Sequence, residues 1–223
     1  MTRTLSHATT SVPESLDDIQ HFVLEDASWE FYVQLLREVG NRQIRVTYDK
    51  GRLEIMSPVA EQERPKKLVG RLVDMLTFEL NCPIESLGST TLRRADLSVG
   101  VDPDECYYFE HEAKMRGRKR LDLRKDPPPE LVVEIDITSR SVPREPIYAA
   151  LGVPEVWRYD GLKLQCLHLV GREYRVRKHS KVFAFLEPAK LGQFIEQLSQ
   201  RDENSILRSF VKWIRDNGWV ASE

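Results

Sequence analysis

The sequence predicts an α/β protein, because helical and strand patterns alternate along one chain. Apolar side chains recur at helical spacing in residues 28–39 and 66–80. Residues 131–137 (LVVEIDI) form a nearly continuous, β-branched apolar run, which is typical of a strand buried on both faces. Residues 153–178 contain alternating runs separated by turn residues, which predicts a strand meander.

The first predicted elements are a helix and a hairpin. Ser28 is a plausible N-cap for the helix at 28–39, and Gly40 is a plausible stop. Residues 44–56 then form two alternating runs around an Asp-Lys-Gly turn, which predicts a β-hairpin.

The helix at 66–80 has an amphipathic apolar stripe, and Pro65 suits its first turn. Two strand-rich runs follow it, at 90–97 (TTLRRADL) and at 104–109 (DECYYF). We interpret both runs as parts of a strand-rich stretch, which precedes the buried strand at 131–137 in the sequence.

The C-terminal half continues with a short helix, the strand meander and two helices. The helix in residues 143–152 is expected to end at Gly152. Asp160-Gly161 is typical of a hairpin turn within the meander. Helices are predicted at roughly 189–199 and 203–217.

The composition fits one sizeable core. The chain has 223 residues, of which 41% are apolar and 30% are charged. We expect residues 1–18, a polar run rich in Ser, Thr and Asp, to be a disordered lead-in. Residues 19–223 are expected to form a single domain. The net charge is -2, so nucleic-acid binding would have to use a local basic patch.

The cysteines and the N-terminus indicate a reducing compartment. Cys82, Cys106 and Cys166 are far apart and form no CxxC pair, so neither a structural zinc site nor a disulfide framework is expected. The N-terminal residues lack the apolar core of a signal peptide, and no apolar run approaches the length of a membrane span. We therefore expect a cytoplasmic protein without a membrane partner.

Two acids in the run LVVEIDI are the most informative feature of the sequence. Because alternate residues of a strand share a face, Glu134 and Asp136 point the same way from a strand that otherwise looks buried. Buried carboxylates need a metal ion or a cationic partner. An ion pair with Arg144 or Arg94 is one interpretation, and a metal site is the other.

A third acid, Asp104, stands where a predicted strand begins, just after Pro103. Its neighbours Asp102 and Glu105 are alternatives, and a solvated turn would also explain an Asp-Pro-Asp run. Asp104 with Glu134 has the composition of a Mg²⁺ site, which takes one or two carboxylates together with water and substrate phosphate. Such a site can polarise a phosphodiester and activate a bound water.

These residues resemble a known family. Pro103-Asp104, about thirty residues before a strand that carries Glu134, has the spacing of PD-(D/E)XK nucleases. Longer runs resemble the Uma-type restriction-endonuclease branch and cover most of the chain. The matching runs are LEIMSP (53–58), LGSTT (87–91), DPDECYYF (102–109), DPPPELVVEIDITS (126–139) and IYAALGVPEVWRYDG (147–161).

The resemblance implies a restriction-endonuclease-like mixed sheet flanked by helices, a divalent metal ion and phosphodiester hydrolysis. Position by position, it assigns Asp104 and Glu134 to metal binding and Glu61 to an accessory acid near the first core helix. Two positions depart from the family pattern. Asp136 stands where the motif has lysine, and Arg144, four residues before Tyr148, is the replacing cation where relatives often have lysine. Arginine does not give up a proton easily, but it can hold a phosphate or stabilise developing charge.

A further departure is Gln62, which stands where relatives often have histidine. The basic runs at 114–120 and 172–181 could each contact nucleic-acid phosphates, or could be solvated surface. The sequence has no GxSxG, P-loop or dinucleotide-binding motif, so other common enzyme classes lack support.

Our first hypothesis is therefore a DNA endonuclease dependent on Mg²⁺ or Mn²⁺ that works as a homodimer. In it, Asp104 and Glu134 bind the metal ion, Asp136 and Glu61 are accessory acids, and Arg144 contacts the scissile phosphate. The second hypothesis is a catalytically inactive relative that binds nucleic acid or protein. The third is an RNA nuclease or a structure-selective repair enzyme that uses the same site.

Overall fold

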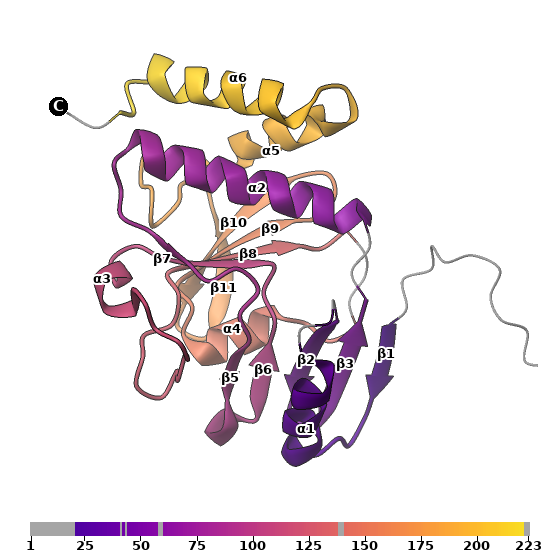
Figure 1. The fold of residues 1–223 in the computed structure, drawn as a ribbon. Coiled ribbons are helices and arrows are strands. Elements are labelled where there is room, and N and C mark those ends of the chain that lie inside the picture. The colour runs from indigo at the N-terminus through magenta and orange to yellow at the C-terminus, as the bar shows by residue number, and fades with distance from the viewer. Residues whose placement is uncertain (1–20, 41, 43, 58–59, 138–140, 221–223) are drawn as a thin grey trace, which may run out of the picture.

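The computed structural model describes residues 21–40, 42, 44–57, 60–137 and 141–220, and the predicted lead-in at 1–18 lies outside them. Within this part the chain forms two β-sheets, with helices on both faces of the larger one (Figure 1). The predicted α/β class is confirmed. The second sheet was not expected, because the resemblance implies only one.

The larger sheet has six strands in the order β11-β10-β9-β8-β7-β4. Its β8 and β9 are parallel while the other neighbours are antiparallel, so the sheet is mixed. The parallel pair is joined by α4 (Glu145–Leu151), as parallel strands require a crossover. The strands are β4 (Glu85–Ser86), β7 (Glu105–Tyr108), β8 (Leu131–Ile135), β9 (Glu155–Tyr159), β10 (Leu164–Val170) and β11 (Glu173–Arg177).

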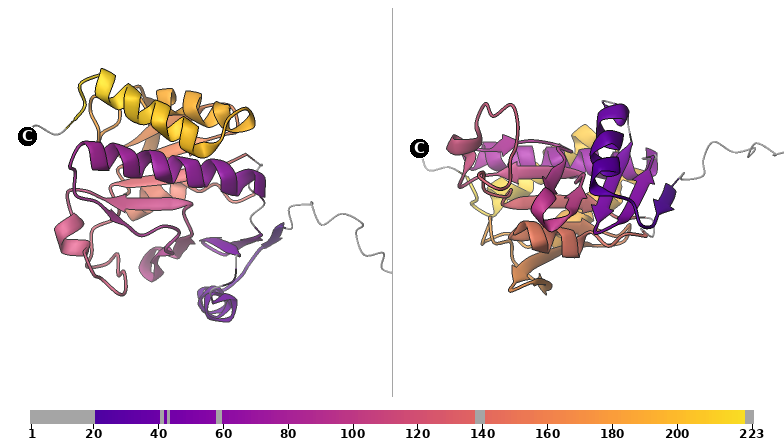
Figure 2. Two further views of the ribbon diagram at one scale, coloured as in Figure 1. Left: turned by 45° about the horizontal axis from the view of Figure 1, so that its top comes forward. Right: turned by 90° about the horizontal axis from the view of Figure 1, so that it is seen from below.

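Three helices cover one face of the larger sheet (Figure 2). They are α2 (Ala60–Glu79), α5 (Ala189–Ile195) and α6 (Glu203–Asp216), and their apolar side chains form one core with alternate residues of the sheet. The short α4 packs on the opposite face and forms a second core with residues of β5 (Leu92–Arg94) and β6 (Val99–Val101).

Strand β8 lies between these two cores, as the sequence predicted. All five of its residues are buried. Leu131, Val133 and Ile135 belong to the core under α2, α5 and α6, whereas Val132 belongs to the core around α4. By strand alternation Glu134 lies on the same side as Val132, so this acid projects toward α4.

The smaller sheet is antiparallel, with the order β1-β3-β2-β6-β5. Helix α1 (Trp29–Val39) packs on it, and Ser28 caps this helix by accepting from the Phe31 N–H. The predicted hairpin is confirmed, with a tight turn between β2 and β3. The remaining strands are β1 (His21–Leu24), β2 (Arg45–Asp49) and β3 (Arg52–Met56).

Further features differ from the prediction. Strand β1, which pairs with β3, was not predicted. Helix α2 begins at Ala60, so Pro65 lies inside it and not in its first turn. Proline lacks the N–H for one helical hydrogen bond, but here the Pro65 and Gln62 side chains are buried and Lys66 pairs with Glu63 at 3.2 Å. Packing and this ion pair hold the extra turn.

The short C-terminal elements follow the prediction. Helix α4 ends at Gly152, which has φ of 81°, and α5 continues into a 3-10 turn at Glu196–Ser199 before α6. A four-residue helix that was not predicted, α3 (Glu112–Met115), includes the first two residues of the basic run at 114–120. None of the helices in the described ranges has the length and apolarity to cross a bilayer.

The contact between α1 and the smaller sheet depends on Gly100 in β6. The Tyr32 ring stacks on Tyr48 with 5.0 Å between centroids, and it lies against the Gly100 backbone. A methyl group at residue 100 would stand 2.1 Å from the Tyr32 hydroxyl oxygen. Only glycine therefore lets α1 approach this sheet.

We predict that Gly100→Ala lowers the free energy of unfolding by about 1–3 kcal/mol, because it forces the Tyr32 ring away. Gly70→Ala is the matched control, since the nearest atom to its added methyl group would be at 3.5 Å and alanine favours a helix. Urea unfolding of both variants is the measurement. Equal stabilities for the two variants would contradict the prediction.

Candidate active site

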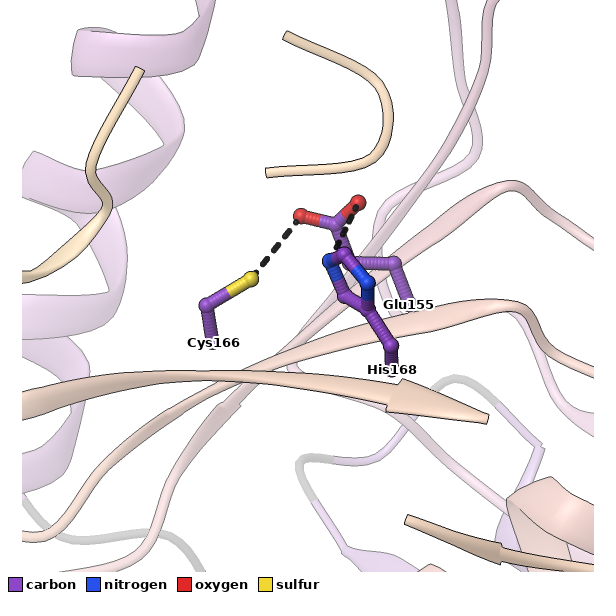
Figure 3. Close-up of side chains that lie close together, drawn as sticks. All are labelled: Glu155, Cys166 and His168. Carbon is purple, nitrogen blue, oxygen red and sulfur yellow. Dashed lines mark hydrogen bonds and ion pairs between the residues drawn. The ribbon is translucent and has the colours of Figure 1, made fainter. Parts of the chain in front are cut away.

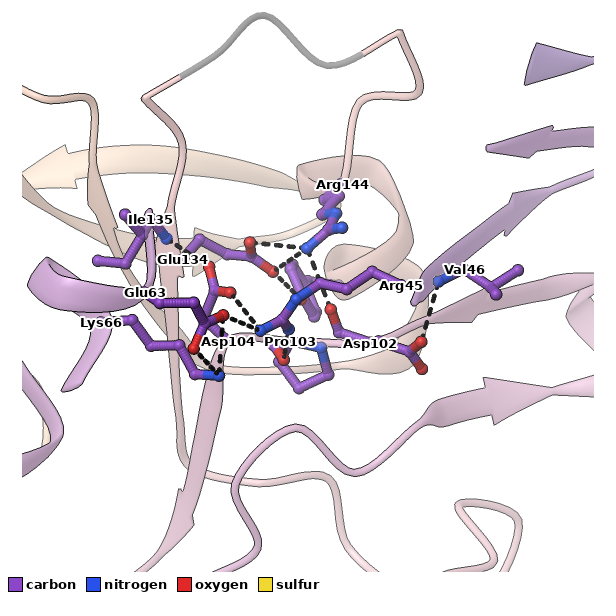
Figure 4. A network of polar contacts seen from close by, with 11 residues as sticks. Arg45, Val46, Glu63, Lys66, Asp102, Pro103, Asp104, Glu134, Ile135 and Arg144 are labelled. Atoms are coloured by element: carbon purple, nitrogen blue, oxygen red, sulfur yellow. Dashed lines mark hydrogen bonds and ion pairs between the residues drawn. The ribbon is translucent and has the colours of Figure 1, made fainter. Parts of the chain in front are cut away.

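Pairing between β7 and β8 brings Asp104 beside Glu134. Glu105 pairs with Val133 and Cys106 with Val132, so the next position in the antiparallel register sets Asp104 opposite Glu134. The Ile135 N–H donates to Asp104 Oδ2 at 2.6 Å. Both carboxyl-bearing residues are only 4% exposed. The two acids that the resemblance assigned to metal binding therefore lie side by side and buried (Figure 4).

Arg45 of β2 joins the smaller sheet to this place. Its Nη2 lies 3.0 Å from Asp104 Oδ1, and its Nη1 donates to the Pro103 carbonyl at 2.7 Å. The same Nη2 is 3.4 Å from Glu63 Oε1. Sequence reasoning missed Arg45, because no local pattern links the hairpin with Asp104.

Arg144 is the partner of Glu134. Its Nη1 lies 2.9 and 3.1 Å from the two Glu134 oxygens and donates to the Asp102 carbonyl at 3.0 Å. The Tyr148 hydroxyl also donates to Glu134. The ion-pair interpretation is thus right in naming Arg144, whereas its alternative, Arg94, pairs with Asp96.

The charge of Arg144 is stabilised by its surroundings. Burial by itself disfavours the guanidinium charge, but Glu134, Tyr148 and Asp104 together outweigh it, so the pKa of Arg144 lies above its usual value. Within the part of the chain that the structure describes, its Nε and Nη2 atoms are buried and have no hydrogen-bond partner. Arg144 is therefore a cation with unused donors beside the acids.

The three neighbouring acids of the 102–105 segment have different places. Asp102 accepts from Thr91 Oγ1 at 2.6 Å and from the Val46 N–H at 3.0 Å. Burial raises the pKa of Asp102, and these hydrogen bonds oppose the shift. Glu105 lies near Gly70 of α2, and burial raises its pKa. Only Asp104 stands next to Glu134, which distinguishes it from the two alternatives.

The remaining predicted residues lie around this centre. The Asp136 N–H donates to the Tyr159 carbonyl at 2.7 Å, just after β8 ends. Asp136 and Glu134, with Arg144 and Tyr148, line a small pocket of about 220 Å³. Glu61 belongs to the first turns of α2, and its side chain is outside the described part.

The acidic centre has the donor chemistry for a hard divalent cation. Carboxylate oxygens are the ligands that Mg²⁺ and Mn²⁺ prefer, and Asp104 and Glu134 supply them from adjacent strands. Each acid also has a guanidinium within hydrogen-bond distance. A bound cation would therefore share these carboxylates with Arg45 and Arg144 or displace the guanidinium groups.

A second group with possible metal ligands lies elsewhere in the larger sheet (Figure 3). Ligand atoms of Glu155, Cys166 and His168 lie within 4.8 Å of one another. However, the Glu155 oxygens already accept from the Trp157 indole at 2.5 Å and from the backbone of Lys181 and Val182 at 2.6 and 3.0 Å.

The Cys166 thiol is also unsuited to metal binding. Burial, and then the Glu155 carboxylate, raise its pKa, although a thiol binds metal as the thiolate. Glu155 is instead a hydrogen-bond centre that fixes the 181–182 backbone to β9. We therefore place the candidate active site at Asp104 and Glu134.

Comparisons with known proteins found one family and a similar solved structure. A family model described as "Uma2: Putative restriction endonuclease" matches residues 29–214. A solved structure from Anabaena variabilis, described as a putative nuclease belonging to DUF820, is similar at 11% identity and a TM-score of 0.43, covering 67% of this chain and 90% of that one. No curated protein matches.

We predict that Arg144→Met lowers the free energy of unfolding by about 3–5 kcal/mol, because it leaves the Glu134 carboxylate buried without its cation. Adding Glu134→Gln to Arg144→Met should recover part of this loss, since the unpaired charge is then removed. Urea unfolding of the wild type, both single variants and the double variant measures the coupling. If the losses in unfolding free energy of the two single variants simply add in the double variant, Arg144 and Glu134 do not stabilise each other.

Proposed function

Since the chain belongs to the Uma2 family of putative restriction endonucleases, we propose that it is a metal-dependent DNA endonuclease with its active site at Asp104 and Glu134. The observation that carries this proposal is the pairing of β7 with β8, which puts these acids side by side under two arginines. Phosphodiester hydrolysis needs acids to hold a cation and fixed positive charge to receive the phosphate.

Asp104 and Glu134 would hold Mg²⁺ or Mn²⁺. The bound ion would supply an activated water and polarise the phosphodiester. The Ile135 N–H and the Tyr148 hydroxyl orient the two carboxylates. Asp136, in the same pocket as Glu134, is an accessory acid in this proposal, and Glu61 is another on the family pattern.

Arg144 would act as a fixed cation and not as a base. A guanidinium stays protonated at neutral pH, and the raised pKa of Arg144 strengthens that argument. Its Nε and Nη2 donors, which lack a partner among the described residues, suit the oxygens of a phosphate. Arg144 would thus supply the positive charge that the lysine of the family motif would otherwise provide.

The proposal extends to assembly and location. We propose a symmetric homodimer with one active site for each DNA strand, formed by a single domain over residues 19–223, in the cytoplasm. A two-fold dimer matches the symmetry of duplex DNA. Size-exclusion chromatography with light scattering, with and without DNA, measures the assembly.

We predict that purified protein cuts supercoiled and linear DNA with Mg²⁺ or Mn²⁺, and that Glu134→Ala lowers the rate at least about 100-fold, as expected when a group that acts in the transition state is lost. EDTA should abolish cutting. Glu173→Ala, which removes an exposed acid of β11, is the matched control and should cut like the wild type. Gel analysis of plasmid nicking and linearisation is the measurement.

Three other outcomes would change the proposal. A folded wild type that cuts nothing with either metal would favour the inactive, binding-only relative. Cutting that survives Glu134→Ala would place the site elsewhere or reveal a contaminant. Faster cutting of RNA than of DNA in a matched panel would favour the RNA nuclease.

We also predict that Arg45→Met binds Mn²⁺ about tenfold more tightly than the wild type, a gain of about 1.4 kcal/mol. Arg45 competes with a metal ion for Asp104 Oδ1. Isothermal titration calorimetry measures the affinity, with Glu134→Ala as the weak-binding reference. Arg52→Met, on the neighbouring β3, is the matched control because Arg52 pairs only at the surface with Glu25. Weaker binding in Arg45→Met would mean that Arg45 positions Asp104 and does not compete.

A further inference from the structure

A cleft of about 860 Å³ opens between the smaller sheet and the start of α2. One wall is the end of α1 and the beginning of β2, and another is formed by α2. The third wall consists of the segments before and within β5 and of the end of the basic loop. The charged residues that line the cleft are Arg37, Arg42, Arg45, Lys66, Arg93, Arg120, Glu63 and Asp102.

The cleft is strongly basic although the protein is not. Six of its lining residues are Arg or Lys and two are acidic, whereas the whole chain has a net charge of -2. Such a local excess concentrates positive potential in a concave surface. The cleft therefore provides the local basic patch that nucleic-acid binding by this chain would require.

Four of these arginines are available to a ligand. Arg37, Arg42, Arg93 and Arg120 are exposed, and within the described ranges they form no ion pair. Arginines on other surfaces do pair, for example Arg71 with Glu203, Arg116 with Glu112 and Arg215 with Glu79. Exposed, unpaired arginines facing one cleft suit a polyanion better than a protein surface of mixed charge.

The inner end of the cleft reaches the active site. Arg45 lines the cleft and also lies 3.0 Å from Asp104 Oδ1. Asp102 lines it too, and the Asp102 carbonyl accepts from Arg144. A chain of phosphates lying along the cleft would thus approach Arg45, whose guanidinium contacts Asp104.

The other basic run, at 172–181, lines no part of the cleft and is partly paired with acids. Arg175 pairs with Glu173, and Lys178 pairs with Glu187. This run belongs to β11, the edge strand that β9 and β10 separate from β8. Of the basic loop at 114–120, only Arg120 lines the cleft, and Arg116 and Arg118 are paired with acids.

We propose that this cleft binds the sugar-phosphate backbone of the nucleic-acid substrate and that α1 and the smaller sheet form one side of the clamp. The inference rests on the proposed function for the identity of its ligand. Each phosphate neutralised by an arginine releases counterions, so binding weakens steeply with salt. The slope of log affinity against log salt concentration then counts the contacts.

The test is fluorescence anisotropy with a short labelled DNA duplex in EDTA, which reads binding separately from cleavage. Arg37→Glu/Arg93→Glu should weaken binding at least tenfold and reduce the salt slope by about 2, close to 0.9 for each lost phosphate contact. Arg172→Glu/Arg177→Glu, which changes the net charge equally on the other basic run, is the matched control and should bind like the wild type. If the glutamate variant unfolds, Arg37→Gln/Arg93→Gln repeats the test, because glutamine removes the positive charges and does not reverse them.

The outcomes separate this inference from the proposed function. In one outcome the wild type binds DNA without cutting it, while the Arg37→Glu/Arg93→Glu variant loses that binding. This result supports the cleft as the binding site and overturns the proposed nuclease activity. An equal loss in both double variants, or no loss in the cleft variant, overturns the cleft even if the protein cuts DNA. Anisotropy with single-stranded DNA and with RNA of the same sequence identifies the preferred nucleic acid. Each result supports the cleft if binding requires the same arginines.

Discussion

Side-by-side burial of Asp104 and Glu134 by the pairing of β7 with β8 constrains the rest of the structure. Two carboxylates that lose water and stand next to each other are tolerated only with cations or strong donors around them. Arg45 comes from the smaller sheet and Arg144 from the segment before α4, so both sheets and the α4 layer converge on this pair. The candidate active site therefore lies at the junction between the two sheets.

Local patterns predicted much of the fold, and long-range contacts account for what they missed. Alternation in LVVEIDI predicted the side to which Glu134 projects, and Ser28 with Gly40 predicted the ends of α1. The role of Arg45 could not be predicted, because its contact with the Pro103 carbonyl spans 58 residues. The early start of α2 was missed for a related reason, since tertiary packing outweighs the local cost of a proline.

The smaller sheet connects folding with the proposed substrate-binding cleft. Gly100 allows Tyr32 to seat α1 on this sheet, and the end of α1 carries Arg37 into the basic cleft. The next strand, β2, carries Arg45 to Asp104. The second sheet, which no local motif predicted, thus supplies both a wall of the cleft and a cation beside the candidate active site.

Arg144 shows why a departure from the family pattern can be consistent with function. A buried guanidinium with donors that lack partners costs free energy in the folded chain, and such costs concentrate at functional sites. Glu134 and the Asp102 carbonyl both engage Nη1, and the described residues offer nothing to Nε and Nη2. Phosphate oxygens would satisfy those two donors, and a lysine in the same place would have no second nitrogen to offer. In the proposed site, Arg144 would not transfer protons, but its Nε and Nη2 would remain for the substrate while Nη1 holds Glu134 in place.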